Sequence, residues 1–224
     1  MDRNTLVGVF AKPASPGAVK TRLIPPLTPQ QAAELHLAML ADVIATARAV
    51  SEGQVELWIA GAATDIERFR ALYSDIVVRA QEGDELGARL ARAFASSFAN
   101  GYERVAIVGS DHPTLPAEYL IGVLCRLEDH DVCLGPSRDG GYYAVGVRRS
   151  SWPRAAEIFR AIPWSTASVL QETLERAREA CLDVWVGHEW YDVDGPDDLE
   201  LLRVDAREDS AAGTCLRRLE GNAS

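Results

Sequence analysis

The segment "VFAKPASPGAVKTRL" (9–23) places three cations around a short loop that follows an apolar run. Lys12, Lys20 and Arg22 flank the loop, two prolines stiffen it, and Gly17 lets the backbone approach a ligand closely. Lysine and arginine form charge-assisted hydrogen bonds with phosphate oxygens, so the loop suits a diphosphate or triphosphate, and we expect Lys20 and Arg22 to be exposed. A hydrated surface loop explains the composition equally well. The segment matches neither the Walker A pattern nor G-x-G-x-x-G.

Two aspartates at the ends of apolar segments are candidates for a metal site. Asp111 follows a buried strand pattern, and Asp194 lies in "WYDVDGPDDLELL" (190–202). Mg²⁺ typically takes one or two carboxylates together with substrate phosphates. The alternatives are that Asp111 caps the turn before Pro113 and that Asp194 caps a helix. Asp192 alternates with Asp194 along a strand end, so we expect these two side chains to face opposite sides.

Two further loops offer polar groups to a ligand. In "GPSRDGGYYAVGV" (135–147), Asp139 precedes two glycines and can present a carboxylate into a cleft, although an ordinary hairpin turn also fits. In "AQEGDELGARLARAF" (80–94), Gln81 and Gly83 lie between a strand and a helix, where an amide can read the edge of a base. Arg89 is by default a solvated helix charge. The four histidines have no metal-ligand spacing.

The overall charge limits the class of partner. The chain has a formal net charge of −10 and an isoelectric point near 4.9. Proteins that bind DNA or RNA normally carry a basic face, so we expect no polymeric nucleic acid partner. A local basic loop in an acidic chain points instead to a small anion.

Strand and helix patterns alternate along the sequence. Strands are predicted over 5–11, 55–61, 75–81, 104–111, 131–137, 142–147 and 182–193, and helices over 28–50, 64–73, 85–101, 116–128, 166–180 and from about 195. This order predicts an α/β fold with a mixed, mainly parallel sheet covered by helices on both faces. Ligands of such sheets bind outside the carboxyl ends of the strands, where the loops named above lie.

Local signals support individual helices. Thr28 as N-cap, Pro29 at the first helical position and Gln31 three residues after the cap predict a capping box. Leu86, Leu90, Phe94 and Phe98 fall on one helical face. The last residues are small and polar.

The length predicts one domain. With 224 residues and 47% hydrophobic residues, the chain can bury a full core. We expect a single domain over 1–204 and a loosely held polar tail over 205–224. No leader-like or membrane-spanning run occurs, and the four cysteines form no C-x-x-C pair, so a cytoplasmic protein with reduced thiols is expected. A homodimer is left open.

Six separated stretches, in order, resemble one family. They are "VFAKPASPGAVKTRL", "QEGDELGARL", "IVGSDHPTLP", "LGPSRDGGYYAVGV", "IPWST" and "DVDGPDDL". Together, over roughly 5–202, they look like the small GT-A-fold glycosyltransferases of arsenosugar biosynthesis or selenodomain association. That family is similar to 2-phospholactate and molybdenum-cofactor guanylyltransferases. The resemblance implies a Rossmann-like α/β/α sandwich of the nucleotide-diphospho-sugar transferase (GT-A) type.

The resemblance also implies roles by position. The phosphates of the nucleotide would contact Gly17, Lys20 and Arg22, with Lys12 nearby, and the base would be bordered by Gln81, Gly83 and Gly87. Asp111 and Asp194 would hold Mg²⁺ or Mn²⁺. The acceptor or sugar pocket would be lined by Asp139, Gly140, Gly141, Trp164, Ser165 and Thr166. The catalytic residues would be Lys20, Arg22, Asp111 and Asp139. Many members of the family have the motif S-D-x-P-D, whereas Thr114 replaces the second acid here, so the metal site has one carboxylate fewer.

Two chemistries are compatible with these residues. A glycosyltransferase would stabilise the departing nucleoside diphosphate, with Asp139 as the candidate base for a small-molecule acceptor. A nucleotidyltransferase would join an NTP to a small phosphorylated substrate and release pyrophosphate, without a protein base. The basic loop favours the second chemistry and the resemblance favours the first, with which we lead. A nucleotide-binding protein without catalysis is the third interpretation.

Overall fold

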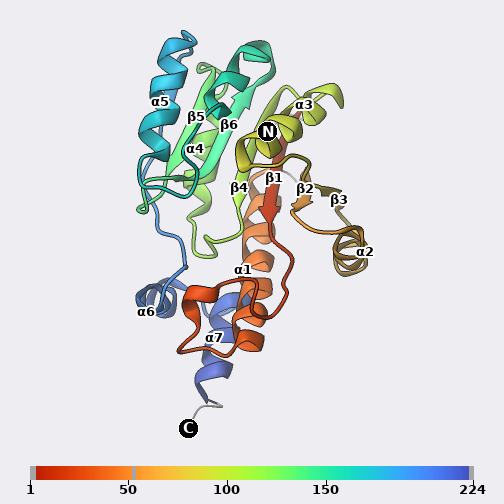
Figure 1. The fold of residues 1–224 in the computed structure, drawn as a ribbon, viewed down its shortest axis with the longest axis vertical. Helices are drawn as coiled ribbons and strands as arrows, with labels where there is room; N and C mark the ends of the chain where they lie inside the picture. Colours follow the sequence, from red (N-terminus) through yellow and green to blue (C-terminus); the bar gives the residue numbers. More distant parts are fainter. Residues whose placement is uncertain (1–3, 52–53, 222–224) are drawn as a thin grey trace.

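A seven-stranded sheet organises the computed structural model, which describes residues 4–51 and 54–221 (Figure 1). The strand order is β3-β2-β1-β4-β6-β5-β7. The strands are Thr5–Ala11 (β1), Val55–Ile59 (β2), Val77–Ala80 (β3), Arg104–Gly109 (β4), Val132–Pro136 (β5), Tyr142–Arg148 (β6) and Val184–Val186 (β7). Strand β6 runs antiparallel to β4 and β5, and the other neighbouring pairs are parallel. The predicted mixed, mainly parallel α/β fold is confirmed.

Helices cover both faces of this sheet. Their bounds are Pro29–Val50 (α1), Ala63–Leu72 (α2), Leu86–Ala99 (α3), Ala117–Arg126 (α4), Val169–Glu179 (α5), Pro196–Asp205 (α6) and Ala211–Gly221 (α7), with short 3-10 turns at Thr21–Leu23 (η1), Arg149–Ser151 (η2) and Arg154–Phe159 (η3). Helix α1 begins with the predicted capping box: the Thr28 side chain accepts from the Gln31 N–H, and the Gln31 side chain accepts from the Thr28 N–H. Within the described residues, no helix has the length and apolar character needed to cross a membrane.

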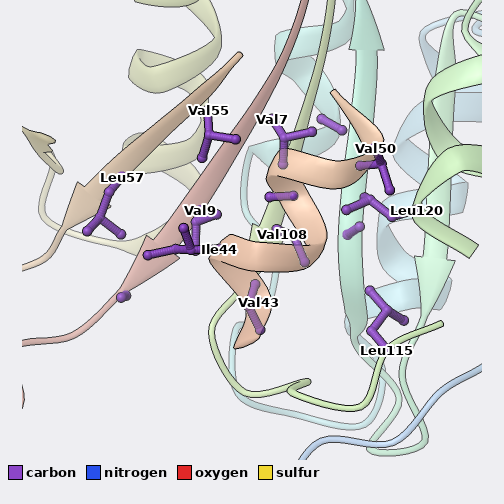
Figure 2. Packing of buried hydrophobic residues seen from close by; sticks show 14 of the residues in the cluster. Val7, Val9, Val43, Ile44, Val50, Val55, Leu57, Val108, Leu115 and Leu120 are labelled. Carbon is purple, nitrogen blue, oxygen red and sulfur yellow. The ribbon is translucent and has the colours of Figure 1, made fainter. Parts of the chain in front are cut away.

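The first core lies between the sheet and helices α1, α2 and α4. Val7 and Val9 of β1 point to this face and share a buried cluster with Val43 and Ile44 of α1, and Figure 2 shows Val9 next to Ile44. The alternate residues of β1 point to the opposite face, because successive side chains of a strand face opposite sides. The sheet is therefore buried on both sides, as its nearly continuous apolar strands predict.

The second core lies on the opposite face, beneath α3, α5 and η3. Leu90, Phe94 and Phe98 of α3 are buried there, and Phe94 stacks on Phe159 with ring centroids 5.5 Å apart. Leu86 departs from the predicted stripe, because it is 40% exposed at the first turn of α3.

A third core joins the end of the chain to α1. Ala212, Cys215, Leu216 and Leu219 of α7 are buried in it, and the carboxylate of Asp42 in α1 accepts from the first two N–H groups of α7. The prediction of a loosely held tail is therefore wrong for Ala211–Gly221. The buried residues of α7 are spaced three and four apart, as on one face of a helix, but the small and polar residues between them make this pattern weak in the sequence. Residues 222–224 of the predicted tail, like residues 1–3 and 52–53 of the predicted domain, lie outside the described residues.

Strand β7 is shorter than the predicted strand over 182–193. After Val186 the chain leaves the sheet, and the following segment is held by backbone hydrogen bonds, which include an isolated bridge between Ser137 and Trp190. The backbone N–H of Val193 then donates to the carbonyl of Asp111 (2.9 Å). The segment before α6 is thus brought to the end of β4 as a loop rather than as a strand.

The start of β5 depends on one buried carboxylate. Asp131, whose side chain is 8% exposed, accepts from the Arg148 guanidinium, the Ser151 hydroxyl and the Asp183 N–H. Burial alone would raise its pKa, but these hydrogen bonds and the charge of Arg148 lower the pKa of Asp131 to about 2. Asp131 therefore ties β5 to the end of β6 and the start of β7.

We predict that Asp131→Asn lowers the free energy of unfolding by about 2 kcal/mol at pH 7. Because the folded-state pKa is depressed, the stabilisation is fully present above the unfolded pKa and disappears as the pH falls through about 2. Urea unfolding at several pH values should show the difference between parent and variant falling to about half by pH 3. Asp129→Asn, at an exposed neighbouring position, is the control. A difference that does not change with pH would contradict this account.

Candidate active site

One cleft opens at the carboxyl ends of β1 to β4. It consists of two cavities, of about 300 and 550 Å³. Both cavities are lined by Lys12, Val19, Lys20, Asp111, Ser165 and Asp194. The smaller, here called the apolar cavity, adds Phe10, Ala11, His36, Ala60, Gln81, Leu86, Arg89, Gly109 and Ser110. The larger, the charged cavity, adds Ala18, Thr21, Arg22, Asp139, Thr166, Ala167 and Asp192. The two cavities meet at Lys20 and the two aspartates that were predicted as metal ligands.

Lys20 lies at the centre of the cleft. Its Nζ is 2.7 Å from Oδ1 of Asp111 and 3.6 Å from Oδ1 of Asp194, and it donates to the carbonyl of Val193 (2.7 Å). Its side chain is only 4% exposed, so the expectation of an exposed Lys20 is wrong. A buried ammonium needs such partners, since an unpaired buried charge is very costly. The residue also has a left-handed backbone (φ 49°), which costs an L-residue about 1–2 kcal/mol.

Arg22 and Asp194 form the outer part of the cluster. Nη1 of Arg22 is 2.6 Å from Oδ2 of Asp194, and the Arg22 side chain is 79% exposed, as expected. Asp194 does not cap α6. The carboxylate of Asp198 does so, accepting from the N–H groups of Asp194 (2.9 Å) and Gly195 (2.7 Å). The side chain of Asp194 is therefore left to face the two cations.

Asp111 directly follows Ser110 at the end of β4. Burial alone would raise its pKa, but the adjacent Lys20 ammonium holds the pKa of Asp111 below its usual range. Its side chain remains 43% exposed and accepts no hydrogen bond from a backbone N–H of the described residues. The turn-capping alternative is therefore not what the side chain does, and Asp111 is an ionised carboxylate facing the cleft.

Two more aspartates face the same cleft. Asp139, predicted on its loop, lines the charged cavity, and one of its oxygens accepts from the Gly141 N–H (2.9 Å). Asp192 lines the same cavity as Asp194, so the expectation that they face opposite sides is wrong, because the segment is not a strand there. Burial, followed by the charge of Asp139, raises the pKa of Asp192. The alternation of the two aspartates was the available signal for Asp192, and it was misread.

The two predicted metal ligands suit a hard divalent cation. Oδ1 of Asp111 and Oδ1 of Asp194 both face the same ammonium, so the two carboxylates face one part of the cleft. Two carboxylates with substrate phosphates are a normal Mg²⁺ set. Thr114 adds no ligand, because its hydroxyl donates to the Tyr191 hydroxyl (2.8 Å) and accepts from the Trp190 indole. Among residues 4–51 and 54–221, no group of three or more acidic, histidine or cysteine side chains forms a protein-only metal cage. The residues therefore fit a site that phosphates would complete.

The predicted base-binding residues separate into two groups. Gln81 lines the apolar cavity, and its Nε2 donates to the carbonyls of Trp58 (2.9 Å) and Ala11 (3.3 Å). Gly83 and Gly87 do not line the cleft. Gly83 accepts from Arg89 Nε, whereas a Cβ on Gly87 would lie 2.2 Å from the Phe159 carbonyl, so close packing of α3 explains this glycine. Arg89 itself lines the apolar cavity instead of being only a solvated charge.

The predicted sugar-pocket residues divide in the same way. Ser165 and Thr166 line the charged cavity. Gly140, Gly141 and Trp164 support it from outside: Gly140 (φ 87°) packs against the Ala167 carbonyl, and the Trp164 ring meets Tyr142 edge-on. Gly17 (φ 78°) turns the opening loop and also does not line the cleft.

His36 was missed by the sequence analysis. It is buried in α1, lines the apolar cavity, and its Nε2 lies 3.1 Å from the carbonyl of Lys12. Burial lowers the pKa of His36, so its ring is neutral at pH 7 and Nε2–H donates to that carbonyl. His36 thus fixes the backbone where the opening loop begins. No spacing in the sequence marks a single histidine for such a role.

Comparisons with known proteins agree with this architecture. The family model DUF2064, whose description is "Uncharacterized protein conserved in bacteria", matches residues 43–166. A structure from Desulfovibrio desulfuricans G20, with a provisional description as a nucleotide-diphospho-sugar transferase, is 32% identical with a TM-score of 0.88, over 97% of this chain and 96% of that one. No curated protein matches the sequence. The predicted nucleotide-diphospho-sugar transferase fold is confirmed, whereas the association with arsenosugar biosynthesis or selenodomain proteins stays a prediction.

More distant structures share the fold. A cytidylyltransferase from Leptospira borgpetersenii serovar Hardjo-bovis is 10% identical, with a TM-score of 0.60 over 98% of this chain and 95% of that one. The 4-diphosphocytidyl-2C-methyl-D-erythritol synthase of Anaerococcus prevotii DSM 20548 is 12% identical, with a TM-score of 0.59 over 96% and 97% of the two chains. Structural neighbours are thus transferases of nucleotidyl and nucleotide-sugar type.

We predict that Arg22→Ala weakens the binding of Mg²⁺-tripolyphosphate about tenfold to a hundredfold, since a hydrogen bond to a charged group contributes about 1.5–3 kcal/mol. The free energy of unfolding should change by less than about 1 kcal/mol, because the Arg22–Asp194 pair is exposed. Isothermal titration calorimetry and urea unfolding measure the two effects. Arg48→Ala, which removes an arginine paired with Asp75 at the far end of α1, is the control and should bind like the parent. Equal affinities for Arg22→Ala and the parent would remove Arg22 from the anion site.

Proposed function

We propose that this chain, which belongs to the DUF2064 family of proteins conserved in bacteria, is a metal-dependent glycosyltransferase that uses a nucleotide-diphosphate sugar and a small-molecule acceptor. The observation that carries the proposal is the convergence of Lys20, Arg22, Asp111 and Asp194 on one cleft at the carboxyl ends of the strands. The similarity to the D. desulfuricans protein, which extends over nearly the whole of both chains, supports the choice of donor.

The charge balance of the cleft supports the metal. Four aspartates and three cations line the charged cavity, so carboxylates outnumber cations before an anionic nucleotide arrives. Asp111 and Asp194 would hold Mg²⁺ or Mn²⁺. When bound, the ion would supply positive charge to the diphosphate that leaves. Lys20, Arg22 and Lys12 would bind the remaining phosphate oxygens.

The apolar cavity suits the nucleoside. Phe10, Leu86 and the small residue Ala60 offer apolar surface to a base and ribose. The two cavities meet at Lys20, which is where the diphosphate would lie if the base occupied the apolar cavity. The sugar and the acceptor would then occupy the charged cavity, beside Thr166, Asp139 and Asp192.

Asp139 is the proposed base for the acceptor. One of its oxygens is engaged by the Gly141 N–H, which orients the carboxylate at the edge of the charged cavity. In the transfer, the bond between the anomeric carbon and the diphosphate oxygen breaks, and a bond from that carbon to the acceptor heteroatom forms. The acceptor proton passes to Asp139, and the nucleoside diphosphate leaves with the bonding electron pair.

Nucleotidyl transfer is the second candidate, and the three cations of the opening loop favour it because they suit a triphosphate. A phosphate oxygen of the acceptor would attack the α-phosphorus of an NTP. The bond to the β-phosphate oxygen would break, and pyrophosphate would leave. An ionised phosphate needs no base, so Asp139 would have no proton to remove.

The products distinguish the two reactions. The enzyme should be incubated with Mg²⁺ or Mn²⁺, panels of NDP-sugars and NTPs, and mixtures of small hydroxyl, thiol and phosphorylated acceptors. We predict release of nucleoside diphosphate from an NDP-sugar and no pyrophosphate from any NTP, measured by ion-exchange chromatography. Pyrophosphate release from an NTP would favour the second candidate, and binding without any turnover would favour a nucleotide-binding protein.

We predict that Asp139→Asn lowers kcat by at least about a hundredfold while nucleotide affinity stays near that of the parent, because a general base contributes about 10²–10⁴-fold. Steady-state kinetics and calorimetry give the two quantities. Glu189→Gln, an exposed acid outside the cleft lining, is the control and should keep full activity. A variant Asp139→Asn nearly as active as the parent would argue against a base at this position.

A further inference from the structure

The central lysine already pairs with the two carboxylates that the proposed metal would need. Oδ1 of Asp111 is 2.7 Å from the Lys20 ammonium, and Oδ1 of Asp194 is 3.6 Å from it. Arg22 occupies the other oxygen of Asp194 at 2.6 Å. A divalent cation that binds both aspartates would therefore meet a lysine and an arginine already paired with them, and cations at such short range repel strongly.

We propose that Lys20 is a built-in competitor of the metal: its ammonium holds Asp111 and Asp194 until nucleotide phosphates attract it, so that the divalent cation binds well only together with the nucleotide. This inference rests on the proposed function, because it requires that Asp111 and Asp194 are metal ligands. It adds an order of binding and a specific role for Lys20 that phosphate contact alone does not require.

The surroundings of Lys20 favour such an exchange. Its ammonium is fixed on one side by the carbonyl of Val193 at 2.7 Å, a neutral acceptor that can be kept when the carboxylate is released. The loop that leads to Lys20 turns at Gly17 (φ 78°), where a Cβ would meet no atom within 4 Å, so the turn itself faces open space. Both cavities reach Lys20, so phosphate oxygens can approach it directly.

Lys12 provides a matched comparison. It lines the same two cavities as Lys20 and carries the same charge, but it forms no ion pair with a carboxylate within the part of the chain that is described. Removing Lys12, which is more exposed than Lys20, changes the formal charge of the cleft by the same one unit, but releases no oxygen of Asp111 or Asp194. A general electrostatic effect would appear in both variants, whereas direct competition would appear only at Lys20.

The test uses Mn²⁺ alone, without nucleotide, and measures its binding to the full chain by electron paramagnetic resonance. We expect Lys20→Met to bind Mn²⁺ at least about tenfold more tightly than both the parent and Lys12→Met, since an ion pair of the competitor is removed. Adding Asp111→Asn to Lys20→Met should abolish the gain. Lys20→Gln, a second neutral variant, guards against a folding defect in the first, and circular dichroism checks both.

Two results would overturn the inference, and they differ in what they say of the function. If the parent binds Mn²⁺ as tightly as Lys20→Met, and Asp111→Asn abolishes binding in both, the metal site stands but Lys20 does not compete for it. If neither Lys20 variant binds Mn²⁺ through Asp111, the competition is refuted together with the metal site of the proposed function.

Discussion

The buried ammonium of Lys20 is the constraint around which the cleft is arranged. A lysine that is almost fully buried must find negative partners, and it finds them on segments far apart in the sequence: Asp111 after β4, and Asp194 with the Val193 carbonyl before α6. The Lys20 ammonium therefore joins three segments of the chain: the opening loop, the end of β4 and the loop before α6. Figure 1 shows the red segment after β1 approaching the blue segment that leads to α6, and the hydrogen bond from Lys20 to the Val193 carbonyl joins these two segments.

The third core, to which α1 and α7 both contribute, holds these segments in place. Leu23 of the opening loop and Tyr191 and Val193 of the C-terminal loop share a buried core with α1 and α7. Asp42 joins α7 to α1 by accepting from its first N–H groups. Helix α7 therefore helps to position the site, because it shares this core with Leu23, Tyr191 and Val193. These three residues are the sequence neighbours of Arg22, Asp192 and Asp194.

Much of this arrangement could be predicted from the sequence, since strand and helix periods were clear and the carboxyl-end rule selected loops that do line the cleft. Lys20, Arg22, Asp111, Asp139 and Asp194 do line one cleft. The contacts between residues that lie far apart in the sequence could not be predicted. The burial of Lys20 depends on Asp111 and Asp194, the face of Asp192 depends on the chain leaving the sheet after β7, and the packing of α7 depends on α1. Gly83 and Gly87 were assigned to the base by resemblance, but packing and a backbone turn account for them.

The central claim is that Lys20, Asp111 and Asp194 together form a site for nucleotide phosphates and a divalent cation. The most direct measurement is anomalous X-ray diffraction from crystals of the protein grown with Mn²⁺ and a nucleoside diphosphate. The account predicts one anomalous peak in contact with carboxylate oxygens of Asp111 and Asp194, with the phosphates beside Lys20 and Arg22. An ordered nucleotide bound elsewhere, or Mn²⁺ bound to the phosphates without contact to either aspartate, would contradict it.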